Sequence, residues 1–347
     1  MALKRITTQD IADACGLSRN TVSKVFNDRG AVPEATRRLV LEKAAELGYS
    51  QQSAERRAAP GGNIAVLTQH KLLSHSFGAY FITSFTEQVS RLGHTMKLYE
   101  VTPQEIRSRV LPAHLDLAET AGLLAIELFD RAYLDMVCDL GKPTVFVDGY
   151  PGAGRSLLRC DFISMENIAV EMALVGGMLR AGARSFGFVG DIGHCNSFYE
   201  RWLGCDLALS EAGISIDRAQ CILEKDSVSY GDADWLLQKL SAMPAIPEAF
   251  VCANDYLAIH LMAALKKLGL SVPGDVMMTG FDGSLEADLV EPRLSTARID
   301  SAEIGRLAAQ QLGRRICEPE ASFCWTYVKT ALVRGDSVRR TGPDTGK

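Results

Sequence analysis

The sequence predicts a small all-α head, containing a helix-turn-helix, followed by a larger α/β body with parallel sheets. In residues 1–49, short apolar faces recur at helical spacing. From residue 63 to residue 338, apolar strand-like runs alternate with amphipathic helical segments. At 347 residues the chain is also too long for one ordinary core, which favours more than one domain.

Charge is divided unevenly between these parts. Residues 1–60 carry a net charge of +3 and residues 61–347 a net charge of −8, within an overall charge of −5. A basic head on an acidic body suggests an anionic partner for the head. No apolar run reaches the ~18 residues that span a bilayer, and the N-terminus lacks a signal-peptide stretch, so we expect a cytoplasmic protein without membrane contact.

Enzymatic and metal-binding motifs are not found. The nine cysteines form no CxxC or zinc spacing, which predicts reduced thiols, no metal site and no cofactor. GxSxG, P-loop and HExxH motifs are missing. An enzyme would have to use Asp148 and Asp282 as acid and base, or Cys195 as a nucleophile, without a paired histidine. We therefore predict no catalytic residues.

The head contains three predicted helices. Thr7 or Thr8 suits the N-cap of the first helix and Gly16 its end. Ser18 suits the N-cap of the second helix, "RNTVSKVFND", whose Val22 and Val25 share one face. The third, "EATRRLVLEKAAELGY", turns Leu39 and Leu47, among others, inward. Two short helices joined by a glycine-containing turn indicate a helix-turn-helix.

The exposed face of the second helix has the chemistry of a DNA reader. A helix of this kind places its N-terminal residues in the major groove. Arginine forks onto guanine and asparagine pairs with adenine, which suits Arg19 and Asn20. Thr21, Ser23 and Asn27 are types that contact phosphate. The alternative is a three-helix scaffold whose polar face is merely solvated.

Polar residues end several predicted strands of the body. "TVFVD" ends in Asp148, "FVCAN" in Asn254 and "MMTGFD" in Asp282, and Arg201 lies in the helix "NSFYERWLG". Ligands of open α/β sheets bind beyond the carboxyl ends of the strands. Together these side chains suit a hydroxyl-rich ligand. The alternative is that each strand-end residue caps the following helix.

The head resembles the DNA-binding domain of the lactose-repressor (LacI/GalR) family of bacterial transcription regulators, over "ITTQDIADACGLSRNTVSKVFN" and "VPEATRRLVLEKAAELGY". The resemblance implies that Arg19, Asn20 and Lys24 read bases of double-stranded operator DNA. Lys24 replaces the more usual arginine and loses its bidentate fork. Thr7, Ser18 and the phosphate-contacting residues complete the predicted DNA-binding set.

The body, including "VFVDGY", "SFYERWLG" and "EPRLSTARID", is similar to the effector-binding core of that family. The resemblance implies a periplasmic-binding-protein-like body of two Rossmann-like lobes with a ligand between them. It implies an effector site at the following residues: Asp148, Arg201, Asn254, Asp282 and, on looser alignment, Phe77, Tyr80 and Asp226. Phe77 and Tyr80 fit a core position equally well.

The expected domains are a head at 1–49, a hinge or linker at 50–62 and an effector-binding body at 63–338. Within the body, the N-lobe is expected at about 63–160 and 297–323, and the C-lobe at about 161–296 and 324–338. Residues 339–347 are expected to be a disordered tail.

The resemblance implies a ligand-responsive regulator, a repressor, that binds a pseudo-palindromic operator as a homodimer. Its effector would be a sugar, sugar acid or polyol. The "LVRGDS" segment is followed by no leucine heptads, so we expect a dimer without a tetramerising helix. A plain solute-binding protein is the alternative from another class, but it leaves the head unexplained.

The segment 50–62 departs from the hinge of this family. In relatives a leucine here wedges between base pairs, whereas Ala58 stands at that position and Arg56 keeps the basic one. Arg56 can still contact phosphates or a narrow groove. The segment is therefore either a passive tether or a hinge that bends DNA less than its relatives do.

Overall fold

The computed structural model describes residues 7–26, 32–47, 62–69, 76–153, 159–226 and 229–340. Asn27, Arg56, Ala58 and most of the predicted hinge lie outside these ranges. Of the expected disordered tail, Arg339 and Arg340 are described, and residues 341–347 lie outside. Arg339 donates to the carbonyl of Gly274 at 3.1 Å and Arg340 to Asp336 at 2.9 Å. Both residues thus make side-chain contacts with the C-lobe.

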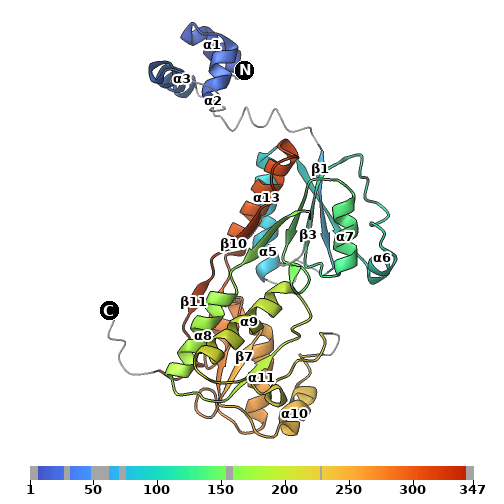
Figure 1. Ribbon diagram of the computed structural model, residues 1–347, viewed down its shortest axis with the longest axis vertical. Coiled ribbons are helices and arrows are strands. Elements are labelled where there is room, and N and C mark those ends of the chain that lie inside the picture. The colour runs from blue at the N-terminus through green and yellow to red at the C-terminus, as the bar shows by residue number, and fades with distance from the viewer. Residues whose placement is uncertain are drawn as a thin grey trace.

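Three helices form the head: α1 (Thr8–Cys15), α2 (Arg19–Phe26) and α3 (Glu34–Glu46) (Figure 1). They share a small core to which each helix contributes two residues: Ile11, Ala12, Val22, Val25, Val40 and Ala44. Leu39 and Leu47 are exposed, so their predicted inward position is wrong. Of the α3 side chains that the structure describes, Val40 and Ala44 are the buried ones, and Leu39 lies one residue off that face.

The body begins with a parallel sheet of six strands in the order β10-β5-β4-β3-β1-β2. The strands are β1 (Asn63–Thr68), β2 (Thr95–Glu100), β3 (Thr120–Ile126), β4 (Thr144–Val147), β5 (Asp161–Met165) and β10 (Trp325–Val328). Side chains of β1 alternate between two cores, with Ile64 and Val66 in one and Ala65 and Leu67 in the other. A central parallel strand is buried on both faces, as this pattern requires.

Helices cover both faces of this sheet (Figure 1). Helices α5 (Ser76–Arg91) and α13 (Ser301–Cys317) supply Phe81, Phe85 and Ile304 to one core. Helices α6 (Pro103–Ser108) and α7 (Arg131–Asp139) supply Ile106 and Tyr133 to the other. This sheet and its four helices form the N-lobe.

The C-lobe contains a parallel sheet of three strands, in the order β6-β7-β8. They are β6 (Phe186–Val189), β7 (Ala249–Cys252) and β8 (Met277–Thr279). The helices of this lobe are α8 (Ile168–Arg180), α9 (Asn196–Glu211), α10 (Ala233–Ala242), α11 (Asp255–Lys267) and α12 (Leu285–Leu289), with a short 3₁₀ turn at Arg218–Gln220. β9 (Thr296–Arg298) pairs antiparallel with β11 (Ala331–Val333). Parallel sheets flanked by helices in two lobes confirm the predicted fold class.

The expected lobe boundaries at 160 and 324 differ from the observed sheets. β5 pairs with β4, and β10 pairs with β5, so both strands belong to the N-lobe sheet. A buried ion pair reinforces this placement, because Nε of Arg315 on α13 donates to Asp161 at the start of β5 at 2.7 Å. The chain therefore crosses to the C-lobe after residue 165, and its last crossing follows residue 328.

No helix in the described part of the chain has both the length and the apolar composition needed to cross a membrane. Within the same residues, no group of three or more His, Cys, Asp or Glu side chains is arranged to hold a metal ion.

Candidate functional site

The second helix of the head presents a polar surface built on two capped helix starts. Thr7 and Asp10 form a reciprocal capping box on α1, and Gly16 ends that helix with φ of +64°. The hydroxyl of Ser18 accepts from the backbone N–H of Thr21 at 3.1 Å, so Ser18 caps α2 as predicted. These caps fix the angle at which α2 leaves the turn.

Arg19, Asn20 and Lys24 are exposed on α2, whereas Val22 and Val25 are buried beneath them. Thr21 and Ser23 are half-buried on the same helix. The predicted base-reading residues therefore share the solvent side of one helix, where a partner surface can meet them. Asn27, predicted to contact phosphate, lies outside the described residues.

In the body, three carboxyl residues end strands in an unusual backbone conformation. Glu127 follows β3 with φ of +51°, Asp148 follows β4 with φ of +59°, and Asp282 lies beyond β8 with φ of +112°. Among the described residues, they are three of the four non-glycine residues with positive φ. Such a conformation costs free energy and tends to mark functional sites.

Asp148 of the N-lobe is bound to the first turn of α9 in the C-lobe. Its carboxylate accepts from the backbone N–H of Ser197 at 3.2 Å and from the Ser197 hydroxyl. It also accepts from the N–H of Gly149 at 2.9 Å. Cys195, the N-cap of α9, makes no side-chain capping bond, so a residue of the other lobe supplies the acceptor at this helix start.

Arg201 lies deep in the same region, with 3% of its surface exposed. Its Nη1 donates to the carbonyl of Ala253 at 2.6 Å and lies 3.3 Å from a carboxylate oxygen of Asp282, and its Nε donates to Asn167 at 3.1 Å. The guanidinium carbon lies 3.6 Å from the ring centroid of Phe281. These contacts hold the Arg201 cation in a fixed position beside Asp282. They involve Nε and Nη1 but not Nη2.

Burial shifts the protonation of the three strand-end carboxyls. It raises the pKa of Glu127 to about 7, with Asp148 adding to the rise. It raises the pKa of Asp282 to about 6 against the opposing effect of Arg201, and it also raises the pKa of Asp148 against the hydrogen bond from Ser197. Near neutral pH this edge of the sheets can therefore both donate and accept hydrogen bonds.

A cavity of about 240 Å³ adjoins this region in the C-lobe. Asp226 and Asn254, both predicted effector residues, line it together with Phe198 and Tyr230, among others. The volume lies just below the range of about 300–1,000 Å³ typical of ligand pockets. Phe198 and residues 253–254 connect the cavity to Arg201, whose guanidinium carbon lies 5.7 Å from the Phe198 ring centroid.

Asn254 both lines the cavity and caps a helix. Its side-chain oxygen accepts from the N–H of Leu257 at 3.0 Å, which is the capping role that the sequence left open. For Asp282 the capping alternative fails, because Ser284 caps the following helix α12 and Asp282 pairs with Arg201.

The predicted aromatic residues of the N-lobe are placed differently. Phe77 packs against the core and stacks on Phe81 with ring centroids 6.1 Å apart. Tyr80 is 56% exposed on α5. Neither residue lines the cavity. The core alternative is thus observed for Phe77.

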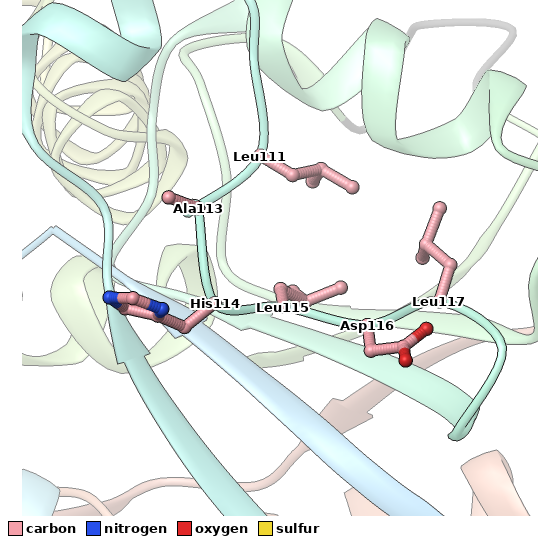
Figure 2. Close-up of a pocket in the computed structure, with 6 residues that line it drawn as sticks. All are labelled: Leu111, Ala113, His114, Leu115, Asp116 and Leu117. Carbon is pink, nitrogen blue, oxygen red and sulfur yellow. The ribbon is translucent and has the colours of Figure 1, made fainter.

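A second cavity, of about 410 Å³, lies inside the loop between α6 and β3. Figure 2 shows the loop curving around it, with His114 turned away from Leu111 and Leu117. It contains none of the predicted site residues.

Glu127 is the site residue that the strand-end argument missed. The run "LLAIE" ends in a carboxyl just as "TVFVD" does, and the register that pairs Ile126 with Val147 places Glu127 beside Asp148. A polar residue that ends an apolar run was the available signal.

The fold and the capped head define a protein with a helix-turn-helix and a two-lobed ligand-binding-type body. Residues 7–52 match the model of the bacterial regulatory proteins of the lacI family, and residues 175–338 match that of the periplasmic binding protein-like domain. Over these two ranges the chain is similar to the lacI family of transcriptional regulators, in its head and in its body. The relatives that it matches are named as transcriptional regulators and repressors.

Similar proteins match over nearly the full length. The probable transcriptional repressor ExuR of Bacillus subtilis and the transcriptional regulator GalR of Streptococcus thermophilus are each 26% identical, over 96% of this chain and 99% of theirs. Among solved structures, a complex of the transcriptional regulator CelR with cellobiose has a TM-score of 0.69 at 23% identity, covering 96% of this chain and all of that one. The lac repressor dimer bound to operator and the anti-inducer ONPF has a TM-score of 0.67 at 22% identity, covering 96% and 99%.

Proposed function

We propose that this protein is a cytoplasmic repressor that binds a pseudo-palindromic operator as a homodimer and responds to a small hydroxyl-rich effector. A sugar, sugar acid or polyol would bind at the lobe boundary, against Asp148, Arg201, Asn254, Asp226 and Asp282. In the head, Arg19, Asn20 and Lys24 would read bases. Thr21 and Ser23 would contact phosphates.

One observation carries the effector part of this proposal. The bond between Asp148 and Ser197 joins the lobes beside a fixed cation, Arg201, and a cavity lined by Asp226 and Asn254. A ligand that hydrogen-bonds to these side chains, or displaces one of their present partners, changes the contact between the lobes. Binding energy at this position can therefore alter the relative geometry of the lobes.

The regulatory consequence follows from linkage. If effector and operator affinities are coupled, each ligand changes the affinity of the other by the same factor, typically about 5- to 150-fold. The cellobiose complex of a structural neighbour and the operator complex of another support the two ligand classes proposed here.

Selection from a randomised duplex library tests the DNA part. We expect the enriched sequences to be pseudo-palindromic and their binding to weaken steeply with salt. Enrichment of a single asymmetric half-site would contradict the dimer. Enrichment of no sequence would contradict the regulator itself.

Calorimetry and thermal melting of the full chain across a sugar panel test the effector part. A shift by at least one sugar or polyol, with a matching change in operator affinity, is expected. A response to purines or amines without hydroxyl groups, with no response to any sugar, would overturn the carbohydrate class.

A further inference from the structure

Glu127 and Asp148 are neighbouring carboxyls at one edge of the N-lobe sheet. The parallel register pairs Ile126 with Val147, so the residues that follow these partners leave adjacent strands side by side. Both have positive φ, which directs the chain out of the strand at the same level. The lobe boundary therefore holds two carboxyls from the N-lobe that face Asp282 of the C-lobe, whose protonation responds to both.

The carboxyl group of Glu127 has no donor assigned to it. Among the hydrogen bonds and ion pairs that the described residues make, Asp148 is reached by Ser197 and Gly149, and Asp282 by Arg201. None of those bonds reaches Glu127, although burial raises its pKa to about 7. Its carboxyl is half-buried rather than sealed in the core, so water or a bound molecule can reach it.

Arg201 is already occupied by groups of the C-lobe. It donates to the carbonyl of Ala253 and to Asn167, and it pairs with Asp282. It is also packed on the face of Phe281. These contacts of the guanidinium include neither Glu127 nor Asp226, and Asp226 lies beside His194. This region therefore holds more carboxyl groups than arginine cations.

The segment carrying Glu127 is linked to the cavity through His194. Phe129, two residues further on, meets His194 edge to face with ring centroids 4.9 Å apart. His194 lies 5.2 Å from Phe198, ring to ring, and its Nδ1 is 3.4 Å from Asp226. Phe198 and Asp226 line the cavity. The cavity, with Asp226 49% exposed on its wall, is thus linked through His194 to the N-lobe segment that carries Glu127.

We propose that Glu127 contacts the effector directly and that the effector carries an ammonium group, as an amino sugar or amino polyol does. This inference rests on the proposed function, because it concerns the same cleft. Glu127 would accept a charge-assisted hydrogen bond from the ammonium, and Asp148, Asn254 and Asp282 would meet hydroxyl groups. A sugar acid would instead bring a further negative charge among these carboxyls.

Proton release is a second consequence of this arrangement. A cation beside Glu127 favours its ionised form, so binding near pH 7 lowers the pKa of the carboxyl and expels a fraction of a proton. A neutral sugar at the same position gives no such electrostatic drive.

Isothermal titration calorimetry of the full chain tests the inference with three matched sets of ligands. Glucosamine, glucose and glucuronic acid form one set, and the galactose and mannose series form the others. We expect a hexosamine to bind at least ten-fold tighter than its matched hexose and hexuronic acid. Titration in two buffers of different ionisation enthalpy should show proton release with the hexosamine.

Glu127→Gln keeps the shape and removes the charge. We expect it to abolish the preference for the hexosamine while changing the affinity for the matched hexose by less than about three-fold. Glu119→Gln, at the opposite end of β3 and paired with Lys97 on the surface, is the control and should keep the preference. Circular dichroism verifies that both variants fold.

The outcomes separate this inference from the proposed function. A hexose or hexuronic acid that binds tighter than its hexosamine, or a preference that survives in Glu127→Gln, overturns the role of Glu127 and leaves the sugar-responsive regulator intact. Binding by none of these sugars overturns the carbohydrate effector and this inference together.

Discussion

Asp148 of the N-lobe joins the two lobes by a hydrogen bond from Ser197, which lies at the start of helix α9 in the C-lobe. The carboxylate accepts from the Ser197 backbone and hydroxyl in the first turn of α9. The N-cap residue of that helix, Cys195, leaves this position without a side-chain acceptor. The thiol of Cys195 is buried, which raises its pKa well above the usual value, so it is a neutral packing group rather than the nucleophile that an enzyme would need.

The Asp148 contact predicts an effector-binding defect in Asp148→Asn. Asparagine tolerates the positive φ at this position but forms no charged hydrogen bond. Losing such a bond costs about 1.5–3 kcal/mol, which corresponds to roughly a ten- to 150-fold weaker effector affinity. Calorimetry measures the affinity, and operator binding without effector should be unchanged. Ser210→Ala, exposed on the same helix α9, is the control. An unchanged affinity in Asp148→Asn would remove Asp148 from the site.

Arg19→Ala should relax the choice of base at one position of each half-site. The loss of a bidentate contact costs about 1–3 kcal/mol of discrimination there. Binding to duplexes that differ at single positions measures it. Arg38, exposed on α3 and near Glu42, is the matched control, and its alanine variant should keep the discrimination. Equal weakening on every duplex would show that Arg19 contacts phosphate instead.

From the buried carboxyl of Glu171 we predict how the free energy of unfolding changes with pH. This residue of α8 is fully buried, burial raises its pKa to about 8, and neither carboxyl oxygen has a hydrogen-bond partner among the described residues. The native state therefore keeps a proton that the unfolded chain releases above about pH 4.5. The stability that this proton provides is complete below pH 4.5 and falls, by up to roughly 1.4 kcal/mol per pH unit, until the pH passes about 8.

Thermal melting from pH 5 to pH 8.5 measures this loss. Glu171→Gln, which cannot titrate, should have a melting temperature that falls less steeply with pH than that of the wild type. The remaining slope comes from other carboxyls whose pKa burial raises, among them Glu127 and Asp255, at about 7, and Asp282, at about 6. Glu211→Gln, exposed at the end of α9, should retain the wild-type slope. Parallel slopes for Glu171→Gln and the wild type would show that Glu171 is ionised in the native state.

From two exposed leucines we predict the surface through which the proposed homodimer forms. Leu285 and Leu289 lie one turn apart on α12, and Leu289 is 83% exposed. Apolar side chains paired at this spacing form a patch typical of contact surfaces. We expect Leu289→Lys to shift the sedimenting species from dimer to monomer at micromolar concentration. Leu207→Lys, exposed on α9, should remain dimeric. A dimeric Leu289→Lys would place the interface elsewhere.

From the sequence of the linker, residues 50–62, we predict that the protein bends its operator only weakly. Ala58 lacks the bulk to separate a base step, so we expect a bend at the dyad below about 40°. Ala58→Leu should increase the bend, and fluorescence resonance energy transfer across a labelled duplex measures it. A bend of about 40° or more in the wild type would show that the wedge is not needed.

Sequence patterns predicted the elements because alternation and helical spacing are local properties. The same reasoning selected Asp148 and Asp282, since a polar residue that ends a buried parallel strand lies at the carboxyl edge of its sheet. It placed β5 and β10 in the wrong lobe, because a buried strand such as "DFISM" fits either sheet and its partner is decided by long-range pairing. It also could not tell that Phe77 packs inward, because one aromatic residue at a helix start fits a core and a ligand face equally well.

Backbone conformation limits how this cleft can be diversified. At positions 127, 148 and 282 the positive φ favours Gly, Asn and Asp and strains β-branched or bulky residues. Random codons there would introduce backbone strain in many variants. Asp226 and Ser229 are exposed, have ordinary backbones and line the cavity, whereas Tyr230 is buried in the C-lobe core. A laboratory that wants a sensor for a different molecule would therefore restrict the first three positions to glycine, asparagine, aspartate and the native residue, and randomise positions 226 and 229.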